Sequence, residues 1–391
     1  MMLRRCAALL CLLIATPTVA ADDPLRGDPF DGRELLTEKQ CVQCHSVWGH
    51  GGLLGSDISS AVAGKNWFEL VGDFWNHTPR MIDAMDKRGY PWPKIDRQEM
   101  ADLLSYLYYL RLFDEPGEAA RGSLAYARQR CDSCHSLGGQ GGSNGGPLDE
   151  FSAYPSPVIL AQAMWNAGPV MQQEQLARGA AIPVFSGTEM ADIQAYIRSQ
   201  ALRRDREVRL LPLPRPAEGR DVFQAKRCAT CHDSDGGGAG PELAESALHL
   251  TVSQISGILW NHSYAMNDQM RASGITFPQF KDGEFADLIS YLQFLGFFRE
   301  QGDPGRGEGL FAARGCDGCH GGPDAGAIDL ATSEAAADSI ALAAAMWNHA
   351  PDMHALLAER AVAWPKFDPG DMEHLAAYLR ALTLEAQQGD R

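Results

Sequence analysis

The chain has 391 residues, a hydrophobic content of 45%, and 50 acidic against 34 basic side chains, which gives a formal net charge of −16. Its length exceeds that of one small domain and predicts three or four units at about 100 to 150 residues each. The acidic balance argues against nucleic acid or an anionic membrane surface as a partner, and it favours a partner protein with a basic docking face.

Residues 1–20 have the layout of a secretory signal peptide. Two arginines precede an apolar run from Ala7 to Ala15, and small residues follow it up to Ala20. This order is typical of a segment that is cleaved during export, here after Ala20 or Ala21. No later run reaches the roughly 20 apolar residues that a membrane-spanning helix needs. We therefore expect a periplasmic protein whose mature chain does not span the membrane.

A C-x-x-C-H motif occurs four times, and successive first cysteines are 90, 97 and 88 residues apart. A glycine stands nine residues before each first cysteine, with a large apolar residue four positions after the glycine. This pattern predicts a short helix that leads into each motif. The glycines are Gly32, Gly122, Gly219 and Gly307, and the apolar residues are Leu36, Tyr126, Phe223 and Phe311.

A tryptophan follows each motif after a glycine-rich stretch of variable length, which indicates a surface loop. From this tryptophan onward the four copies align without a gap, with a methionine at +6, a proline at +18 and a tyrosine at +31. In the first copy Leu103, Tyr106, Leu107 and Leu110 are spaced as the buried stripe of a terminal helix. Strand-like alternation is scarce, so the predicted class is all-α.

The repeat predicts four tandem domains, and their shared variations suggest a duplicated pair. Copies one and three share Ser-Tyr-Leu, whereas copies two and four share Ala-Met-Trp-Asn. We infer two dihaem halves, residues 22–205 and 215–386. The predicted domains are residues 27–115, 117–203, 215–300 and 303–386, and residues 204–214 form an arginine-rich linker that we expect to be a solvated joint.

The C-x-x-C-H motif is typical of covalent haem c attachment, in which both cysteines form thioether bonds and the histidine binds the iron. One such motif alone could also be a redox dithiol or half a zinc site. Four in phase favour haem, so we expect four haem c groups. Their attachment residues are Cys41, Cys44, Cys131, Cys134, Cys228, Cys231, Cys316 and Cys319, and their proximal ligands are His45, His135, His232 and His320.

The methionine at +6 is the predicted sixth ligand, because a thioether favours ferrous iron and raises the reduction potential. These residues are Met81, Met171, Met266 and Met353. The competitors His77, His262 and His349 lie at +2, but the second copy has Ala167 there, so histidine cannot be the shared ligand. A histidine or a neighbouring methionine in one copy stays open. The periodic methionines Met100, Met190 and Met372 fit the core stripe of the last helix instead.

The four tryptophans are predicted to be core anchors that pack against haem or helix, with an indole N–H bound to a haem propionate as the functional alternative. The three histidines at +2 are predicted to be ordinary polar residues near the loop. These tryptophans are Trp75, Trp165, Trp260 and Trp347.

Together these residues resemble the class I c-type cytochromes, as four tandem copies over about residues 27–386. The resemblance implies that the first and last helices of each copy cross, with Gly219 packing near Tyr291. It also implies that a proline carbonyl after the haem site binds the proximal histidine. Gly146-Pro147 and Gly240-Pro241 match this pattern, whereas copies one and four have Gly55-Ser56 and Gly326-Ala327.

The expected function is one-electron transfer between redox partner proteins by a periplasmic tetrahaem cytochrome that is not itself an enzyme. A second class stays open, in which the chain is the electron-accepting subunit of a substrate dehydrogenase or of another haem oxidoreductase complex. A peroxidase-type site or a gas sensor would need an open or exchangeable iron position, and four methionines argue against both.

Overall fold

The computed structural model describes residues 27–62, 64–112, 117–202, 209, 212–232, 238–248, 250–322 and 327–389. The predicted signal peptide and most of the predicted linker lie outside these residues. Within them the only strands form two antiparallel ladders, β1 (Ser46–Val47) with β2 (His50–Gly51) and β3 (Ser136–Leu137) with β4 (Gln140–Gly141). The predicted all-α class is confirmed.

The described helices fall into four units with one order of elements. Unit one contains α1 (Pro29–Glu38), the 3-10 helix η2 (Cys41–Gln43), α2 (Ile58–Ala61), α3 (Trp67–Asp86) and α4 (Arg97–Leu110). Unit two contains α5 (Ala119–Arg128), η3 (Cys131–Ser133), η4 (Leu148–Ala153), α6 (Val158–Ala177) and α7 (Glu189–Gln200).

Units three and four repeat this order. Unit three contains α8 (Pro216–Ala225), η5 (Cys228–Thr230), α9 (Leu243–Leu248), α10 (Val252–Ala272) and α11 (Glu284–Phe297). Unit four contains α12 (Pro304–Ala313), α13 (Asp317–His320), η6 (Leu330–Thr332), η7 (Glu334–Ala337), α14 (Ser339–Glu359) and α15 (Asp371–Gly389).

The first helix of every unit crosses the last one, as the resemblance implies. The crossing depends on the repeated glycine, because a Cβ at Gly219 would lie 2.0 Å from the carbonyl oxygen of Asp287 and 2.7 Å from the Cβ of Tyr291. The apolar residue one turn later fills the space beside it, and the rings of Phe223 and Tyr291 have centres 5.5 Å apart. Gly32, Gly122 and Gly307 make the same close approach in their units.

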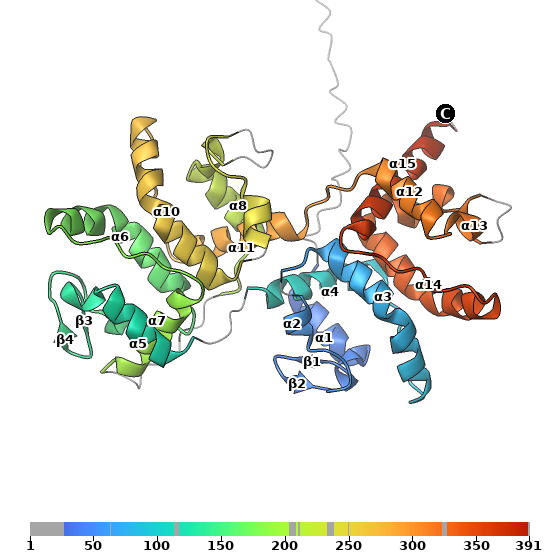
Figure 1. Ribbon diagram of the computed structural model, residues 1–391, viewed down its shortest axis with the longest axis horizontal. Helices are drawn as coiled ribbons and strands as arrows, with labels where there is room; N and C mark the ends of the chain where they lie inside the picture. The colour runs from blue at the N-terminus through green and yellow to red at the C-terminus, as the bar shows by residue number, and fades with distance from the viewer. Residues whose placement is uncertain are drawn as a thin grey trace, which may run out of the picture.

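The units pair in a nested order that differs from the sequence halves. Figure 1 shows two lobes, one built from units two and three and the other from units one and four. In the inner pair, units two and three, α6 packs against α10. In the outer pair, units one and four, α14 packs against α3 and α4 and α15 packs against α3. The two dihaem halves inferred from the sequence reflect a duplicated pair, and the packing cuts across them, because each lobe takes one unit from each half.

The repeated Trp-Asn dipeptide creates both pairs. In the outer pair the indole Nε1 of Trp75 donates to the carbonyl of Pro365 at 2.8 Å, and Asn76 exchanges two hydrogen bonds with the backbone of Phe367 at 2.7 and 2.9 Å. Unit four makes the same hydrogen bonds to unit one: Trp347 donates to the carbonyl of Pro93, and Asn348 exchanges two hydrogen bonds with the backbone of Ile95. The contact is reciprocal, as in a two-fold dimer.

The inner pair repeats this arrangement between different residues. Trp165 donates to the carbonyl of Pro278 at 2.9 Å, and Trp260 donates to the carbonyl of Pro183 at 2.8 Å. Asn166 and Asn261 again bind the backbone of a phenylalanine two positions after each proline. The tryptophans are core residues, as predicted, since Trp75, Trp165 and Trp260 are buried and Trp347 packs against the same core. Their N–H groups bind backbone carbonyls of the partner unit, so the alternative of a propionate partner does not apply to them.

The outer pair has an additional contact that depends on proline chemistry. Pro79 and Pro351 lie inside α3 and α14, four residues after Trp75 and Trp347. Proline has no N–H, so the tryptophan carbonyl one turn earlier loses its helical donor. The indoles of Trp364 and Trp92 donate to these two carbonyls, each at 3.1 Å. Each donor indole also stacks on the tryptophan whose carbonyl it binds, with ring centres 4.4 Å apart.

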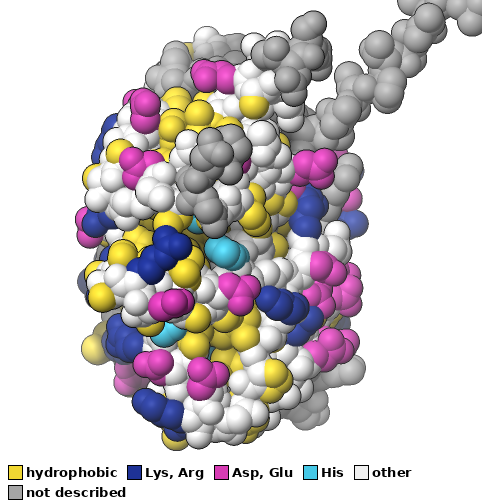
Figure 2. Space-filling view, turned by 90° about the vertical axis from the view of Figure 1, so that its right-hand side faces the viewer, with side chains coloured by type: hydrophobic (Ala, Val, Ile, Leu, Met, Phe, Trp, Pro, Cys, Tyr) yellow, Lys and Arg dark blue, Asp and Glu magenta, His cyan; other side chains and the backbone are white. Residues whose placement is uncertain are grey.

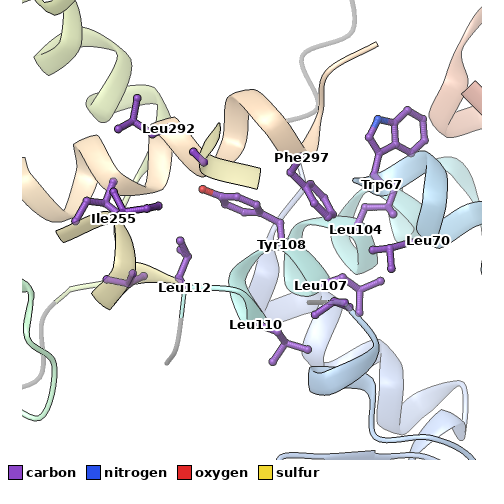
Figure 3. Packing of buried hydrophobic residues seen from close by; sticks show 14 of the residues in the cluster. Trp67, Leu70, Leu104, Leu107, Tyr108, Leu110, Leu112, Ile255, Leu292 and Phe297 are labelled. Atoms are coloured by element: carbon purple, nitrogen blue, oxygen red, sulfur yellow. The ribbon is translucent and has the colours of Figure 1, made fainter. Parts of the chain in front are cut away.

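The two lobes meet where α4 faces α11 (Figure 3). The side chain of Tyr108 is 2% exposed, and its hydroxyl donates to the carbonyl of Ser290 in unit three. Its ring lies 5.5 Å from that of Phe297, and the Arg111 guanidinium lies 5.3 Å from the centre of the Phe297 ring. This buried contact joins unit one to unit three and so connects the outer pair to the inner pair.

Candidate haem sites

Each C-x-x-C-H motif lies in one helical turn directly after the first helix of its unit. In units one, two and three the residue before the first cysteine has a positive φ of 64°, 54° and 63°, at Gln40, Arg130 and Arg227. This left-handed residue turns the chain away from the long helix. The histidine N–H then binds the carbonyl of the first cysteine in all four motifs, at 3.0, 2.9, 3.0 and 2.8 Å.

The proximal imidazoles are held by backbone carbonyls. Nδ1 of His45 lies 2.9 Å from Ser56 O, that of His135 lies 2.8 Å from Gly146 O, that of His232 lies 3.1 Å from Pro241 O, and that of His320 lies 2.9 Å from Ile328 O. A carbonyl only accepts, so Nδ1 carries the proton and Nε2 is left free to bind a metal.

The carbonyl partners correct part of the resemblance. Only unit three uses the proline carbonyl, since unit two uses Gly146 rather than Pro147. Units one and four keep the hydrogen bond without a proline. The feature that the four units share is therefore a backbone oxygen within hydrogen-bonding distance of the imidazole, whatever side chain that residue carries.

Glycines allow this carbonyl-bearing segment to approach the imidazole. A Cβ on Gly55 would lie 2.4 Å from Cε1 of His45, and Gly145 is equally close to His135. Gly240 has the same relation to His232, at 2.5 Å. Any side chain at these positions would push the histidine ring out of place, which explains glycines that the sequence pattern assigned only to a loop.

The first cysteine of each motif is half-buried. Burial raises the thiol pKa of Cys41 and Cys228 to about 11 and that of Cys131 to about 12, and it raises the pKa of Cys316 as well. A thiol with so high a pKa stays protonated at neutral pH and is a poor nucleophile. The polypeptide alone therefore gives these thiols little reactivity.

The predicted sixth ligands lie on the long helix after the loop. Met81 is on α3, Met171 on α6, Met266 on α10 and Met353 on α14, and all four are half-buried. Met171, Met266 and Met353 pack against the hydrophobic core. The periodic Met100, Met190 and Met372 are only 4%, 1% and 3% exposed, so their interpretation as core residues is confirmed.

The histidines at +2 differ between the pairs. The ring of His77 lies 6.2 Å from that of His45, and the ring of His349 lies 6.0 Å from that of His320, measured between ring centres. Burial, with Arg80 and His45, lowers the pKa of His77, and burial with His320 lowers that of His349. In unit three His262 is exposed, and its Nδ1 lies 2.9 Å from the carbonyl of Ile258 in its own helix. His262 agrees with the prediction of an ordinary polar residue. His77 and His349 agree with it less well, because their rings lie close to the motif histidines.

The surroundings of the motifs fit a haem. Among the described residues, the hydroxyls of Tyr126 and Tyr264 and the indole nitrogen of Trp67 are buried without a hydrogen-bond partner. Tyr126 lies five residues before Cys131, and Tyr264 lies two residues before Met266. Buried polar atoms are rarely left unpaired, so each of these donors is available to a polar group such as a propionate.

Two regions of the chain match a known protein family. The family model described as Cytochrome c matches residues 30–111 and 216–296, which correspond to units one and three. Units one and three are therefore similar to cytochrome c domains. Such domains imply covalently bound haem c and haem-based electron transfer. A search of the curated proteins and a search of the solved structures each found no match.

The surface of the outer pair is mixed in character. Figure 2 views this lobe from its side and shows histidine side chains within hydrophobic surface, among scattered acidic and basic groups. None of the described helices is both long enough and apolar enough to cross a lipid bilayer. The Trp-Asn dipeptide and the proline at +18 are the functional residues whose role sequence reasoning missed. The available signal was their constant spacing in all four copies, because iron ligation alone does not require a fixed distance from the tryptophan to the proline.

Proposed function

We propose that the chain is a periplasmic tetrahaem c-type cytochrome that carries single electrons between partner redox proteins. Each unit is one cytochrome c domain with one haem, with boundaries near residues 27–115, 117–203, 215–300 and 303–386. The single observation that carries the proposal is the fourfold placement of a C-x-x-C-H histidine whose Nδ1 is fixed by a backbone carbonyl. Units two and four repeat the helices of the two matched regions, which supports the same role for them.

In this proposal the chain's residues attach, orient and insulate the redox group. The cysteine pairs form the thioether bonds, and the carbonyl-bound histidines present Nε2 to the iron. The helix after the loop supplies the sixth ligand. Met171 and Met266 have this role in units two and three, while the helices of units one and four each offer a methionine and a histidine, Met81 with His77 and Met353 with His349. When bound, haem supplies a one-electron ferric/ferrous couple.

The pairing of units gives the electron path its order. Because the outer pair joins the two ends of the sequence and the inner pair joins its middle, the haems of units one and two belong to different lobes, as do those of units three and four, whereas the haems of units two and three share a lobe. The Tyr108 to Ser290 contact is where the lobes touch. Electrons that enter one lobe leave from the other across this junction, and the net negative charge of the chain favours partners with basic docking faces.

Intact-mass analysis and a redox titration of the exported protein test the proposal. The mass should be that of a polypeptide that lacks residues 1–20 or 1–21 and carries four haems. The titration should show that the protein takes up four electrons reversibly. The variant His135→Ala should lose the histidine ligand of one haem, and it should change one of the four one-electron steps in the titration. A mass with fewer than four haems, or a protein that takes up no electrons reversibly, would contradict the proposal.

A further inference from the structure

The distance between the two histidine rings in units one and four matches two imidazoles on one iron. A metal–imidazole bond is about 2 Å long and the ring centre lies about 1 Å behind the nitrogen, so two such rings on opposite sides of an iron have centres about 6 Å apart. The observed separations are 6.2 Å for His45 and His77 and 6.0 Å for His320 and His349.

A histidine that only touched the far face of a haem would lie farther away. Contact with the flat ring system keeps heavy atoms about 3.5 Å from its plane, which itself lies about 3 Å from the centre of the proximal imidazole. Such a ring centre would be more than about 6.5 Å from the proximal one. The observed separations are shorter than this in both units, and they occur independently in two stretches of sequence.

Unit three supplies an internal control. Its helix also carries a histidine two residues after the tryptophan, yet His262 is exposed and its Nδ1 lies at hydrogen-bonding distance from Ile258 O. Unit two has Ala167 at this position. The histidine is thus turned toward its proximal partner only in units one and four, which are the two units that pair with each other.

We propose that His77 and His349 are the sixth ligands of the haems in units one and four, so that the outer pair holds bis-imidazole iron and the inner pair holds imidazole–thioether iron. This inference rests on the proposed function, and it replaces Met81 and Met353 as ligands. Both methionines lie one helical turn after the histidines, on the same face of the helix. They pack beside the site as neighbours of the ligand.

The assignment divides the four haems into two redox classes. A thioether raises the reduction potential relative to an imidazole. The outer pair therefore has the two lower potentials and the inner pair the two higher ones. Electrons that arrive at units one and four pass downhill to units two and three across the junction at Tyr108.

The test counts iron–sulfur bonds in the oxidised whole protein. The thioether-to-iron charge-transfer band should have the intensity of two haems out of four. Electron paramagnetic resonance should show two bis-imidazole centres. Met171→Leu and Met266→Leu should each remove half of the band, whereas Met81→Leu and Met353→Leu should leave it unchanged. A band with the intensity of four haems, or one reduced by a quarter in Met81→Leu, overturns the inference.

Histidine variants give the complementary result. His77→Leu should abolish one of the two bis-imidazole signals and shift one of the two low potentials, and His262→Leu is the matched control that should change neither. An unchanged bis-imidazole signal in His77→Leu would also refute the assignment. If a variant fails to accumulate, the wild-type band intensity still decides. Haem number by mass distinguishes failure of this inference from failure of the proposed function. Four haems with four iron–methionine bonds would refute only the histidine ligands and would still agree with electron transfer.

Discussion

The outer and inner pairs use one backbone interface and two different sets of side chains. In both, a Trp-Asn dipeptide binds the carbonyl of a proline and the backbone two residues beyond it. The outer pair adds Trp92 and Trp364 before the prolines, whereas the inner pair has Ile182 and Phe277 there. The shared hydrogen bonds do not distinguish one partner unit from another, so we expect the extra indoles to select which units pair.

The alternative arrangement shows how this choice works. If units three and four were partners, the indole of Trp364 would meet the carbonyl of Trp260. Unit three has Tyr264 where the others have proline, so its helix keeps an N–H for that carbonyl, and the hydroxyl of Ser263 already donates to it at 2.7 Å. An indole N–H buried without an acceptor costs about 1 to 3 kcal/mol. The nested order avoids this cost.

The largest expected effect comes from breaking the outer interface at its centre. Trp75→Ala removes a buried ring, its stacking on Trp364 and its hydrogen bond to Pro365, and should lower the free energy of unfolding by about 3 to 5 kcal/mol. Denaturant unfolding followed by haem absorbance measures this. Trp48→Ala is the control, because Trp48 is 42% exposed and its loss should change stability by less than about 0.5 kcal/mol. Equal effects for the two variants would contradict a pairing role.

A second variant separates the lobes from each other rather than the units within a lobe. Tyr108→Phe keeps the ring but removes the donor to Ser290, and it should cost about 0.5 to 1.5 kcal/mol because one buried hydrogen bond between the lobes is lost. The Ser290 carbonyl keeps its helical N–H partner within α11. The expected result is weaker coupling between the lobes, with each pair intact. Hydrogen exchange at α4 and α11 measures it, and increased exchange at the Trp-Asn dipeptides instead would show that the lobes are not independent.

The selectivity of the pairs is tested by exchanging the residue before the proline. Trp364→Phe leaves the carbonyl of Trp75 without its indole donor and should destabilise the outer pair by about 1 kcal/mol. Phe277→Trp places an indole near the carbonyl of Trp165, which Pro169 leaves without a helical donor, and should stabilise the inner pair by about 0.5 to 1.5 kcal/mol. Thermal unfolding of both variants measures the signs, and two effects of the same sign would refute this explanation.

The smallest effect compares glycines at equivalent places in α3 and α10. A Cβ on Gly72 would be 3.8 Å from its nearest neighbour, Met372, whereas a Cβ on Gly257 would be 3.3 Å from the Cβ of Phe185. Gly72→Ala should therefore stabilise the helix by up to about 1 kcal/mol. In Gly257→Ala the contact with Phe185 should cancel this gain. Melting temperatures measure the difference. An equal gain in both variants would show that Phe185 can shift at little cost to make room for the added Cβ.

Much of each site could be predicted because it is local in sequence. The cysteine pair and the histidine occupy one turn of chain. The glycine nine residues before them recurs in every copy, and it allows the first and last helices to cross. The carbonyl that holds each proximal imidazole could not be predicted reliably, because it depends on where a loop of variable length places a backbone oxygen. Ser56 and Ile328 provide this oxygen without a proline.

The sequence by itself determined the helical class, the number of C-x-x-C-H motifs and the residues that can attach and bind haem, because these depend on spacing within a few turns. Tertiary structure alone decided that unit one pairs with unit four, that the tryptophans bind partner units, and that His77 and His349 turn toward the proximal imidazoles while His262 does not. These facts depend on contacts between residues as much as 291 positions apart. A pattern within one repeat contains no information about which other repeat it will meet.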